Sequence, residues 1–97
     1  MNKYESVIII NSKLAEDAIK VVIAKFSDLI NSNGKVESVE ELGMKKLAYE
    51  IKKQAEGYYA VINFEANPSF ISELERVYRI TDEIIKFIVI KKEDSVK

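Results

Sequence analysis

The sequence contains few of the side chains that usually carry out catalysis. It has no cysteine and no histidine, so neither a thiol nucleophile nor an imidazole base is available. Its paired carboxylates, such as Glu73 and Glu75, stand among lysines and arginines, which favours surface ion pairs over an acid–base pair. The sequence also lacks a glycine-rich phosphate loop and any metal-ligand spacing. We therefore predict a protein that is not an enzyme and that uses no metal and no cofactor.

Basic side chains are the remaining candidates for chemistry, because ammonium and guanidinium groups bind phosphate. The formal net charge is −1, which argues against a general polyanion binder, so any contact with nucleic acid depends on local charge. A phosphate contact is sensitive to salt and carries no base specificity, and most charge runs are only solvated faces. The basic residues that could reach phosphate are Lys3, Lys45, Lys46, Lys52, Lys53, Arg76, Arg79, Lys86, Lys91 and Lys92.

Mixed charges surround one glycine in the middle of the chain. Glu40 and Glu41 precede Gly43, and Lys45 and Lys46 follow it. Charges on an edge strand prevent unwanted pairing with other strands. The same charges also suit a partner protein whose own charges complement them. The two interpretations are compatible.

Hydrophobic periodicity predicts the elements that position these residues. Runs rich in β-branched residues indicate strands, and apolar residues three and four apart indicate helices. In the second helix the buried stripe is Phe70, Ile71, Leu74, Val77 and Tyr78. The predicted elements, in chain order, are a strand at 4–10, a helix from an Asn11 or Ser12 cap to Asn33–Gly34, an irregular strand from Lys35 that bends at Gly43 and alternates from Lys46, a strand at 58–64, a helix opened by Asn67–Pro68, and a strand at 84–90.

Residues 40–64 form a predicted hairpin. Residues 53–57 interrupt its alternation, and Gly57 is expected to adopt the positive φ of the turn. The side chains of this hairpin that are expected in the core are Leu47, Tyr49, Ile51, Tyr58, Ile62 and Phe64.

The order βαββαβ in a chain of 97 residues predicts an α+β fold, the ferredoxin-like sandwich. In this fold a four-stranded antiparallel sheet has the order 2-3-1-4, and two helices cover one face. We predict a single domain over residues 1–91, followed by a short flexible tail at 92–97. The apolar run before Asn11 is too short for a membrane span and lacks a signal-peptide cleavage site, so we expect a cytoplasmic protein without membrane contact.

Alternation along the strands divides their side chains between two faces, although the opposite parity remains an alternative. The open face is then partly apolar, which is typical of a contact site. A second layer of core is the alternative, but the sequence offers no long segment to cover it. The side chains expected toward the helices are Ser6, Ile8, Ile10, Tyr58, Ala60, Ile62 and Phe64, and those expected on the open face are Glu5, Val7, Ile9, Tyr59, Val61 and Asn63.

The third strand does not carry the base-stacking pattern of RNA-recognition domains. Residues 56–63 keep the glycine, one aromatic residue and the valine of that pattern, but lack its leading cation and two of its aromatic residues. The sequence therefore does not predict base stacking by an RNA-recognition type of sheet.

Several motifs together resemble a known family. They are Tyr4–Glu5, then Glu41–Ile51 (ELGMKKLAYEI), then Gly57–Tyr58–Tyr59, and finally Glu73–Asp82 (ELERVYRITD). This combination is similar to bacterial small-subunit ribosomal protein six, over about residues 3–91. The family commonly has arginine where this chain has Lys45, Lys46 and Lys86, and lysine lacks the bidentate fork of a guanidinium group.

The resemblance implies the ferredoxin-like fold and a structural, non-catalytic role. It implies that the protein pairs with small-subunit ribosomal protein eighteen, and that the pair binds the central domain of 16S ribosomal RNA in the small subunit. By the same resemblance, the partner protein is expected at Glu40, Glu41, Lys45 and Lys46, and ribosomal RNA at Lys3, Lys52, Lys53, Arg79 and Lys86. The isolated chain is expected to be a monomer with no small-molecule substrate.

A different class of function remains open from the residues alone. A ferredoxin-like regulatory domain could form a homodimer through its edge strand and bind a small molecule. Such a domain would sediment as a stable dimer, whereas the ribosomal interpretation predicts a monomer that sediments with small subunits.

Overall fold

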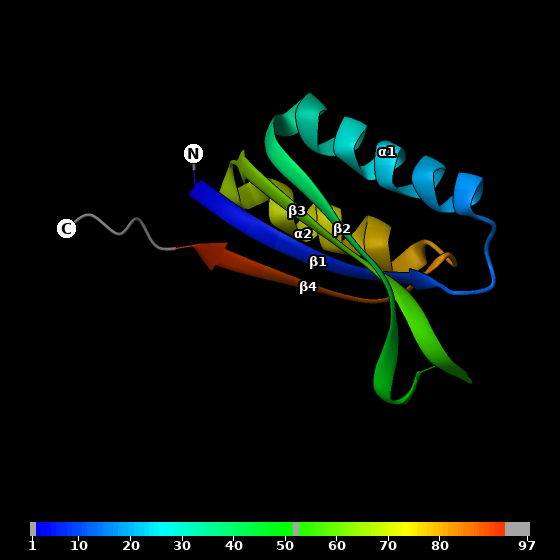
Figure 1. The fold of residues 1–97 in the computed structure, drawn as a ribbon. Helices are drawn as coiled ribbons and strands as arrows, with labels where there is room; N and C mark the ends of the chain where they lie inside the picture. Colours follow the sequence, from blue (N-terminus) through cyan, green and yellow to red (C-terminus); the bar gives the residue numbers. More distant parts are fainter. Residues whose placement is uncertain (1, 52, 93–97) are drawn as a thin grey trace.

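The computed structural model describes residues 2–51 and 53–92 and has the element order that the sequence predicts (Figure 1). The elements are β1 (Asn2–Asn11), α1 (Glu16–Asn33), β2 (Gly34–Ile51), β3 (Gln54–Ala66), α2 (Pro68–Ile80) and β4 (Ile84–Lys92). The strands form one sheet in the order β2-β3-β1-β4, and all neighbouring pairs are antiparallel. The predicted ferredoxin-like α+β fold is confirmed.

The main core lies between the sheet and the two helices. Ile8 of β1 and Ile62 and Phe64 of β3 pack with Phe26 of α1 and Leu74 of α2, and all of these side chains are fully buried. Each such burial stabilises the fold by roughly 1.5–3 kcal/mol relative to leaving the side chain exposed. The predicted parity of β1 and β3 and the predicted stripe of α2 are therefore correct.

One polar contact lies inside this core. The hydroxyl oxygens of Ser6 on β1 and Tyr78 on α2 are 2.7 Å apart, and both residues are almost completely buried. Burial raises the pKa of Tyr78 to about 12, while the hydrogen bond with Ser6 acts in the opposite direction. The pair satisfies two polar groups that would otherwise be costly to bury.

The start of α2 agrees with the sequence, and the start of α1 does not. Asn67 caps α2 by accepting a hydrogen bond from the backbone N–H of Ser69, and Pro68 is the first helical residue. In α1 the capping residue is Ala15, which has no side-chain acceptor. Asn11 instead accepts the backbone N–H of Lys13 within the turn after β1. The predicted cap at Asn11 or Ser12 is wrong because Asn11 stabilises this turn and not the helix.

The end of α1 also differs from the prediction. Gly34 has an extended backbone, with φ at −176°, and begins β2 opposite Ala66. A Cβ atom at Gly34 would overlap the carbonyl oxygen of Glu65. Glycine is thus required here by a close approach between two strands and not by a left-handed helix end.

The hairpin turn lies at the beginning of the predicted interruption, residues 53–57, and not at its end. Ile51 already pairs with Gln54, and Lys53 has the positive φ of 65°. Gly57 is instead a buried residue within β3, where a Cβ atom would overlap the Cγ2 methyl of Ile9. The assignment of the turn to Gly57 is wrong, because this glycine lets β3 pack closely on β1.

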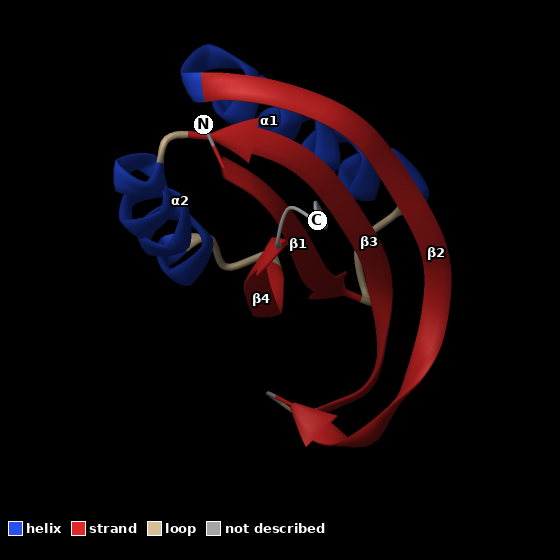
Figure 2. Ribbon diagram, turned by 90° about the vertical axis from the view of Figure 1, so that its left-hand side faces the viewer, coloured by secondary structure: helices blue, strands red, loops and turns tan. Residues whose placement is uncertain are grey.

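The hairpin curls over the face of the sheet that carries no helix (Figure 2). Leu47 of β2 reaches Ile9 of β1 and Ile85 of β4, and the three side chains form a second, smaller buried cluster. The expectation that no segment covers this face is therefore wrong for its hairpin end. Tyr49 was expected in the core, but its exposed fraction is 66%.

Candidate nucleic-acid and partner interfaces

The predicted partner residues lie together on the free edge of β2. Glu40, Glu41, Lys45 and Lys46 are all exposed, and they flank Gly43, whose φ of +89° marks a bulge. At ~3.3 Å per residue the edge from Glu40 to Lys46 is about 20 Å long. We call this stretch, residues 40–46, the β2 edge.

The β2 edge is held in place partly by a hydrogen bond to its neighbour β3. The hydroxyl of Tyr58 donates to the carboxylate of Glu41, at 2.8 Å. This hydrogen bond raises the pKa of Tyr58, because the neutral phenol is its donor. Glu41 is thus held toward β3, although it is exposed in the same way as Glu40.

Sequence reasoning missed two apolar side chains of the β2 edge. Leu42 and Met44 are 47% and 46% exposed, on either side of Gly43. The signal was present, since the spacing of apolar residues before Gly43 fits neither a strand nor a helix. An exposed apolar centre flanked by charges is typical of a protein contact.

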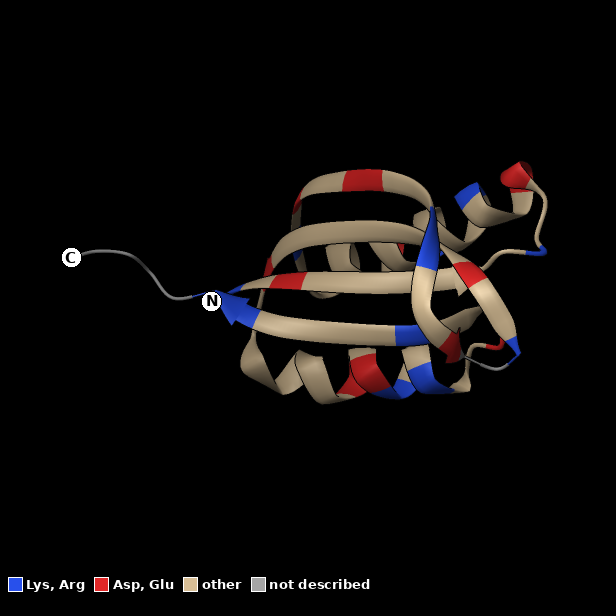
Figure 3. Cartoon of the chain, turned by 60° about the horizontal axis from the view of Figure 1, so that its bottom comes forward, with Lys and Arg blue, Asp and Glu red and all other residues tan. Residues whose placement is uncertain are grey.

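The predicted RNA-binding residues do not form one cluster. Lys3 pairs with Lys92 across β1 and β4, whereas Lys86 lies opposite Ile9. Six strand residues separate these positions, or ~20 Å. Figure 3 shows basic positions at both ends of β4. The structure therefore has two separate basic regions along this strand.

Lys3 belongs to the region at the start of β1. Its ammonium group lies 3.8 Å from Glu37 and 3.9 Å from Glu65. Pairs this exposed contribute at most about 1 kcal/mol, so phosphate can compete for Lys3. Lys91 and Lys92 lie opposite Tyr4 and Lys3 in the neighbouring strand, and the ammonium group of Lys92 donates to Asn63.

Arg79 and Lys86 belong to the other region. Both line a shallow hollow of about 270 Å³ between the end of α2 and the start of β4. Lys53 is exposed in the hairpin turn, and Lys52 lies outside the described residues.

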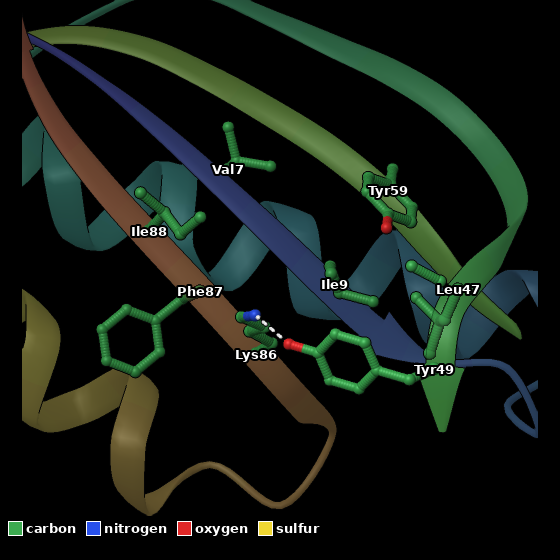
Figure 4. A pocket seen from close by; sticks show the side chains of 9 residues that line it. Val7, Ile9, Leu47, Tyr49, Tyr59, Lys86, Phe87 and Ile88 are labelled. Atoms are coloured by element: carbon green, nitrogen blue, oxygen red, sulfur yellow. Dashed lines mark hydrogen bonds between the residues drawn. The ribbon is translucent and has the colours of Figure 1, made fainter. Parts of the chain in front are cut away.

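The hairpin and the open face of the sheet enclose an apolar cleft of about 190 Å³ (Figure 4). Its wall includes Ile9, Leu47, Tyr59 and Tyr49. Tyr49 extends from β2 toward β4, where its hydroxyl accepts a hydrogen bond from the ammonium group of Lys86, at 3.4 Å. The same ammonium group lies 5.7 Å from the centre of the Tyr49 ring, within the range of a cation–π contact. The cleft was not predicted, because it depends on the curl of the hairpin.

Two kinds of feature are absent from residues 2–51 and 53–92. No group of three or more carboxylates there is arranged to hold a metal ion. Neither helix of that part is long and apolar enough to span a membrane.

Comparisons with known proteins identify the family. The family model described as Ribosomal protein S6 matches residues 3–91. Small ribosomal subunit protein bS6 of Clostridium perfringens strain 13 is 50% identical over 94 residues, which cover 96% of this chain and 99% of the relative. The protein of the same name from Clostridium botulinum strain Loch Maree is 47% identical over 94 residues, which cover 96% and 100%.

A solved structure supports the same relationship. The crystal structure of 30S ribosomal protein S6 from Thermotoga maritima matches with a TM-score of 0.90 at 38% identity, covering 94% of this chain and 87% of that chain. The family comprises structural proteins and not enzymes. Because the family model covers nearly the whole chain and the fold agrees, the chain belongs to the ribosomal protein S6 family.

Proposed function

We propose that this chain is a structural component of the bacterial small ribosomal subunit, where it binds the central domain of 16S ribosomal RNA together with small-subunit ribosomal protein eighteen. The observation that carries the proposal is the near full-length similarity to relatives named small ribosomal subunit proteins. The chain acts in the cytoplasm, where ribosomes assemble.

The β2 edge is the proposed docking site for the partner protein. It combines charges of both signs, Glu40 and Glu41 on one side and Lys45 and Lys46 on the other, with exposed Leu42 and Met44 between them. Complementary charges on the partner fix the register of the contact, and the apolar centre supplies burial. The bulge at Gly43 interrupts the regular edge that a second copy would pair with, so the isolated chain is proposed to be a monomer.

Ribosomal RNA is proposed to contact the basic regions at Lys3 and at Arg79 and Lys86, with Lys53 contributing at the hairpin turn and Lys52 as its neighbour in sequence. The net charge of −1 supports a shared interface, because a basic partner can supply most of the phosphate neutralisation.

Charge reversal at the β2 edge tests the partner contact. We expect the double variant Glu40→Lys/Glu41→Lys to bind the partner at least tenfold more weakly, a loss of about 1.4 kcal/mol or more. The matched control is Asp17→Lys/Asp28→Lys, which makes the same change in net charge on the exposed surface of α1. Equal binding by the two variants in isothermal titration would contradict the proposed docking site.

A further inference from the structure

The cleft on the open face has the size of a single aromatic ring system. Its volume is about 190 Å³, and an apolar cavity of ~150 Å³ is large enough to take benzene. Two of its wall residues, Tyr49 and Tyr59, are aromatic and incompletely buried. Aromatic side chains of this kind stack on nucleic-acid bases.

The charges around the cleft favour an anionic occupant. Lys86 lines both the cleft and the adjoining hollow, and Arg79 lines the hollow. No aspartate or glutamate among the described residues lines either space. Asp82 and Glu83 lie nearby in the turn before β4, but outside both linings. A ring in the cleft with a phosphate beside Lys86 and Arg79 fits this arrangement better than an apolar protein side chain does.

The polar groups of the cleft are mainly hydrogen-bond donors. The ammonium group of Lys86 donates to the Tyr49 oxygen, so the phenol hydrogen of Tyr49 and two ammonium hydrogens of Lys86 are left to donate to a ligand. At C4 of a pyrimidine or C6 of a purine, uracil and guanine carry a carbonyl oxygen, which accepts a hydrogen bond, whereas cytosine and adenine carry an amino group, which donates one. Donors at the mouth of the cleft therefore suit a base with a carbonyl edge.

We propose that this cleft binds one unstacked uracil or guanine base of RNA, with Lys86 and Arg79 contacting the adjoining phosphate. The inference rests on the proposed RNA-binding function and adds a base-recognition site to it. It uses Tyr49 of β2 and Tyr59 of β3, brought together with Lys86 of β4 by the curl of the hairpin (Figure 4). This geometry differs from the flat stacking surface whose sequence pattern β3 lacks.

Short single-stranded oligonucleotides test the site on the intact chain. Tyrosine fluorescence can report binding, because the chain contains no tryptophan. We expect oligouridine to bind severalfold more tightly than oligocytidine at low salt. Tyr49→Leu should weaken oligouridine binding about tenfold, as expected for loss of one stacked base. Tyr49→Phe should weaken oligouridine binding less than Tyr49→Leu does and should reduce the preference for uridine, because it keeps the ring and removes one of the donors.

A charge control separates the site from general electrostatics. Lys86→Met should weaken oligouridine binding more than Lys20→Met, which removes the same charge from the exposed surface of α1. Equal binding of the two oligonucleotides, together with no effect of Tyr49→Leu, would overturn the proposal.

Two further outcomes distinguish the site from the general function. If Tyr49→Leu weakened binding of the partner protein and left RNA binding unchanged, the cleft would be a protein contact and the base site would be wrong. If the unaltered chain did not sediment with small subunits, the proposed function itself would fail, whatever the oligonucleotides showed.

Discussion

At the scale of single residues, the buried hydroxyl pair of Ser6 and Tyr78 specifies how α2 sits on the sheet. The pair joins β1 to α2 at 2.7 Å inside an otherwise apolar core. A buried hydroxyl without a partner costs about 1–3 kcal/mol, whereas replacing both partners by apolar groups is nearly neutral. The pair therefore matters more for the unique arrangement of the core than for its net stability.

A double-mutant cycle measures this coupling. Tyr78→Phe and Ser6→Ala should each lower the free energy of unfolding by about 1–3 kcal/mol, because each leaves one buried hydroxyl without its partner. The double variant should lose clearly less than the sum of the two. Urea denaturation followed by circular dichroism gives the three values, and strictly additive losses would show that the hydrogen bond is not formed.

The pKa of Tyr78 predicts a loss of stability in alkali. Burial raises this pKa from 10.0 to about 12 in the folded protein. The unfolded chain releases the proton first, so the contribution of Tyr78 is fully present below pH 10 and is lost as the pH rises toward 12. The loss at pH 12 is on the order of 2–3 kcal/mol.

Tyr78→Phe is the control for this pH effect. Thermal unfolding of the unaltered chain should show a steeper fall in stability between pH 10 and 12 than that of the variant. Identical slopes in this range would rule out Tyr78 as the cause.

At the scale of elements, the β2–β3 hairpin shapes the candidate sites. Gly57 is a residue at which this hairpin packs closely on β1. A Cβ atom there would overlap the Cγ2 methyl of Ile9 and would lie 3.5 Å from Ile85. The Cγ2 methyl is attached to a branched carbon and cannot move away by itself. The hairpin must therefore lift wherever residue 57 gains a side chain.

Gly57→Ala should lower the free energy of unfolding by about 1–3 kcal/mol, the usual cost of overpacking a close contact. The loss should be smaller in an Ile9→Ala background, where the obstructing methyl is absent. Ala55→Ser, at an exposed position of the same strand, should change stability by less than about 0.5 kcal/mol. Chemical denaturation compares the free energies of unfolding of these variants. A Gly57→Ala variant as stable as the Ala55→Ser variant would contradict the close contact between Gly57 and Ile9.

The sequence predicted correctly those element boundaries that depend on residues adjacent in sequence. The Asn67–Pro68 start of α2 uses a cap and a proline that are adjacent in sequence, and it was predicted correctly. The roles of Gly34 and Gly57 were not, because each depends on a strand that lies far away in sequence: Glu65 and Ala66 for Gly34, and Ile9 for Gly57. Sequence alone shows that a glycine is present, but not which neighbour excludes a Cβ atom.

At the scale of the whole molecule, the two edge strands of the sheet, β2 and β4, differ in their charges. The free edge of β2 carries the mixed charges, and β4 carries basic residues at both ends (Figure 3). Yet the curl of the hairpin brings Tyr49 of β2 to Lys86 of β4, although these strands are not neighbours in the sheet. In the proposed arrangement, a partner at the β2 edge and RNA near β4 can bind at the same time.

The arrangement of the whole molecule also decides which parts of the candidate sites could be predicted from the sequence. The position of the β2 edge in the fold could be predicted from the sequence, because its residues are consecutive and its charges flank one glycine. The cleft could not, because the alternation that assigned Tyr49 to the core assumed a flat hairpin. The separation of Lys3 from Lys86 likewise follows from strand register and not from the number of basic residues.

The proposed function requires that the chain binds ribosomal RNA as half of a pair. The most direct measurement is filter binding of a 16S central-domain fragment at physiological salt, with the chain alone, with small-subunit ribosomal protein eighteen alone, and with both. The proposed function predicts weak binding by the chain alone and at least tenfold tighter binding by the pair than by either protein, a difference of about 1.4 kcal/mol or more. An affinity of the chain alone that equals that of the pair would contradict it.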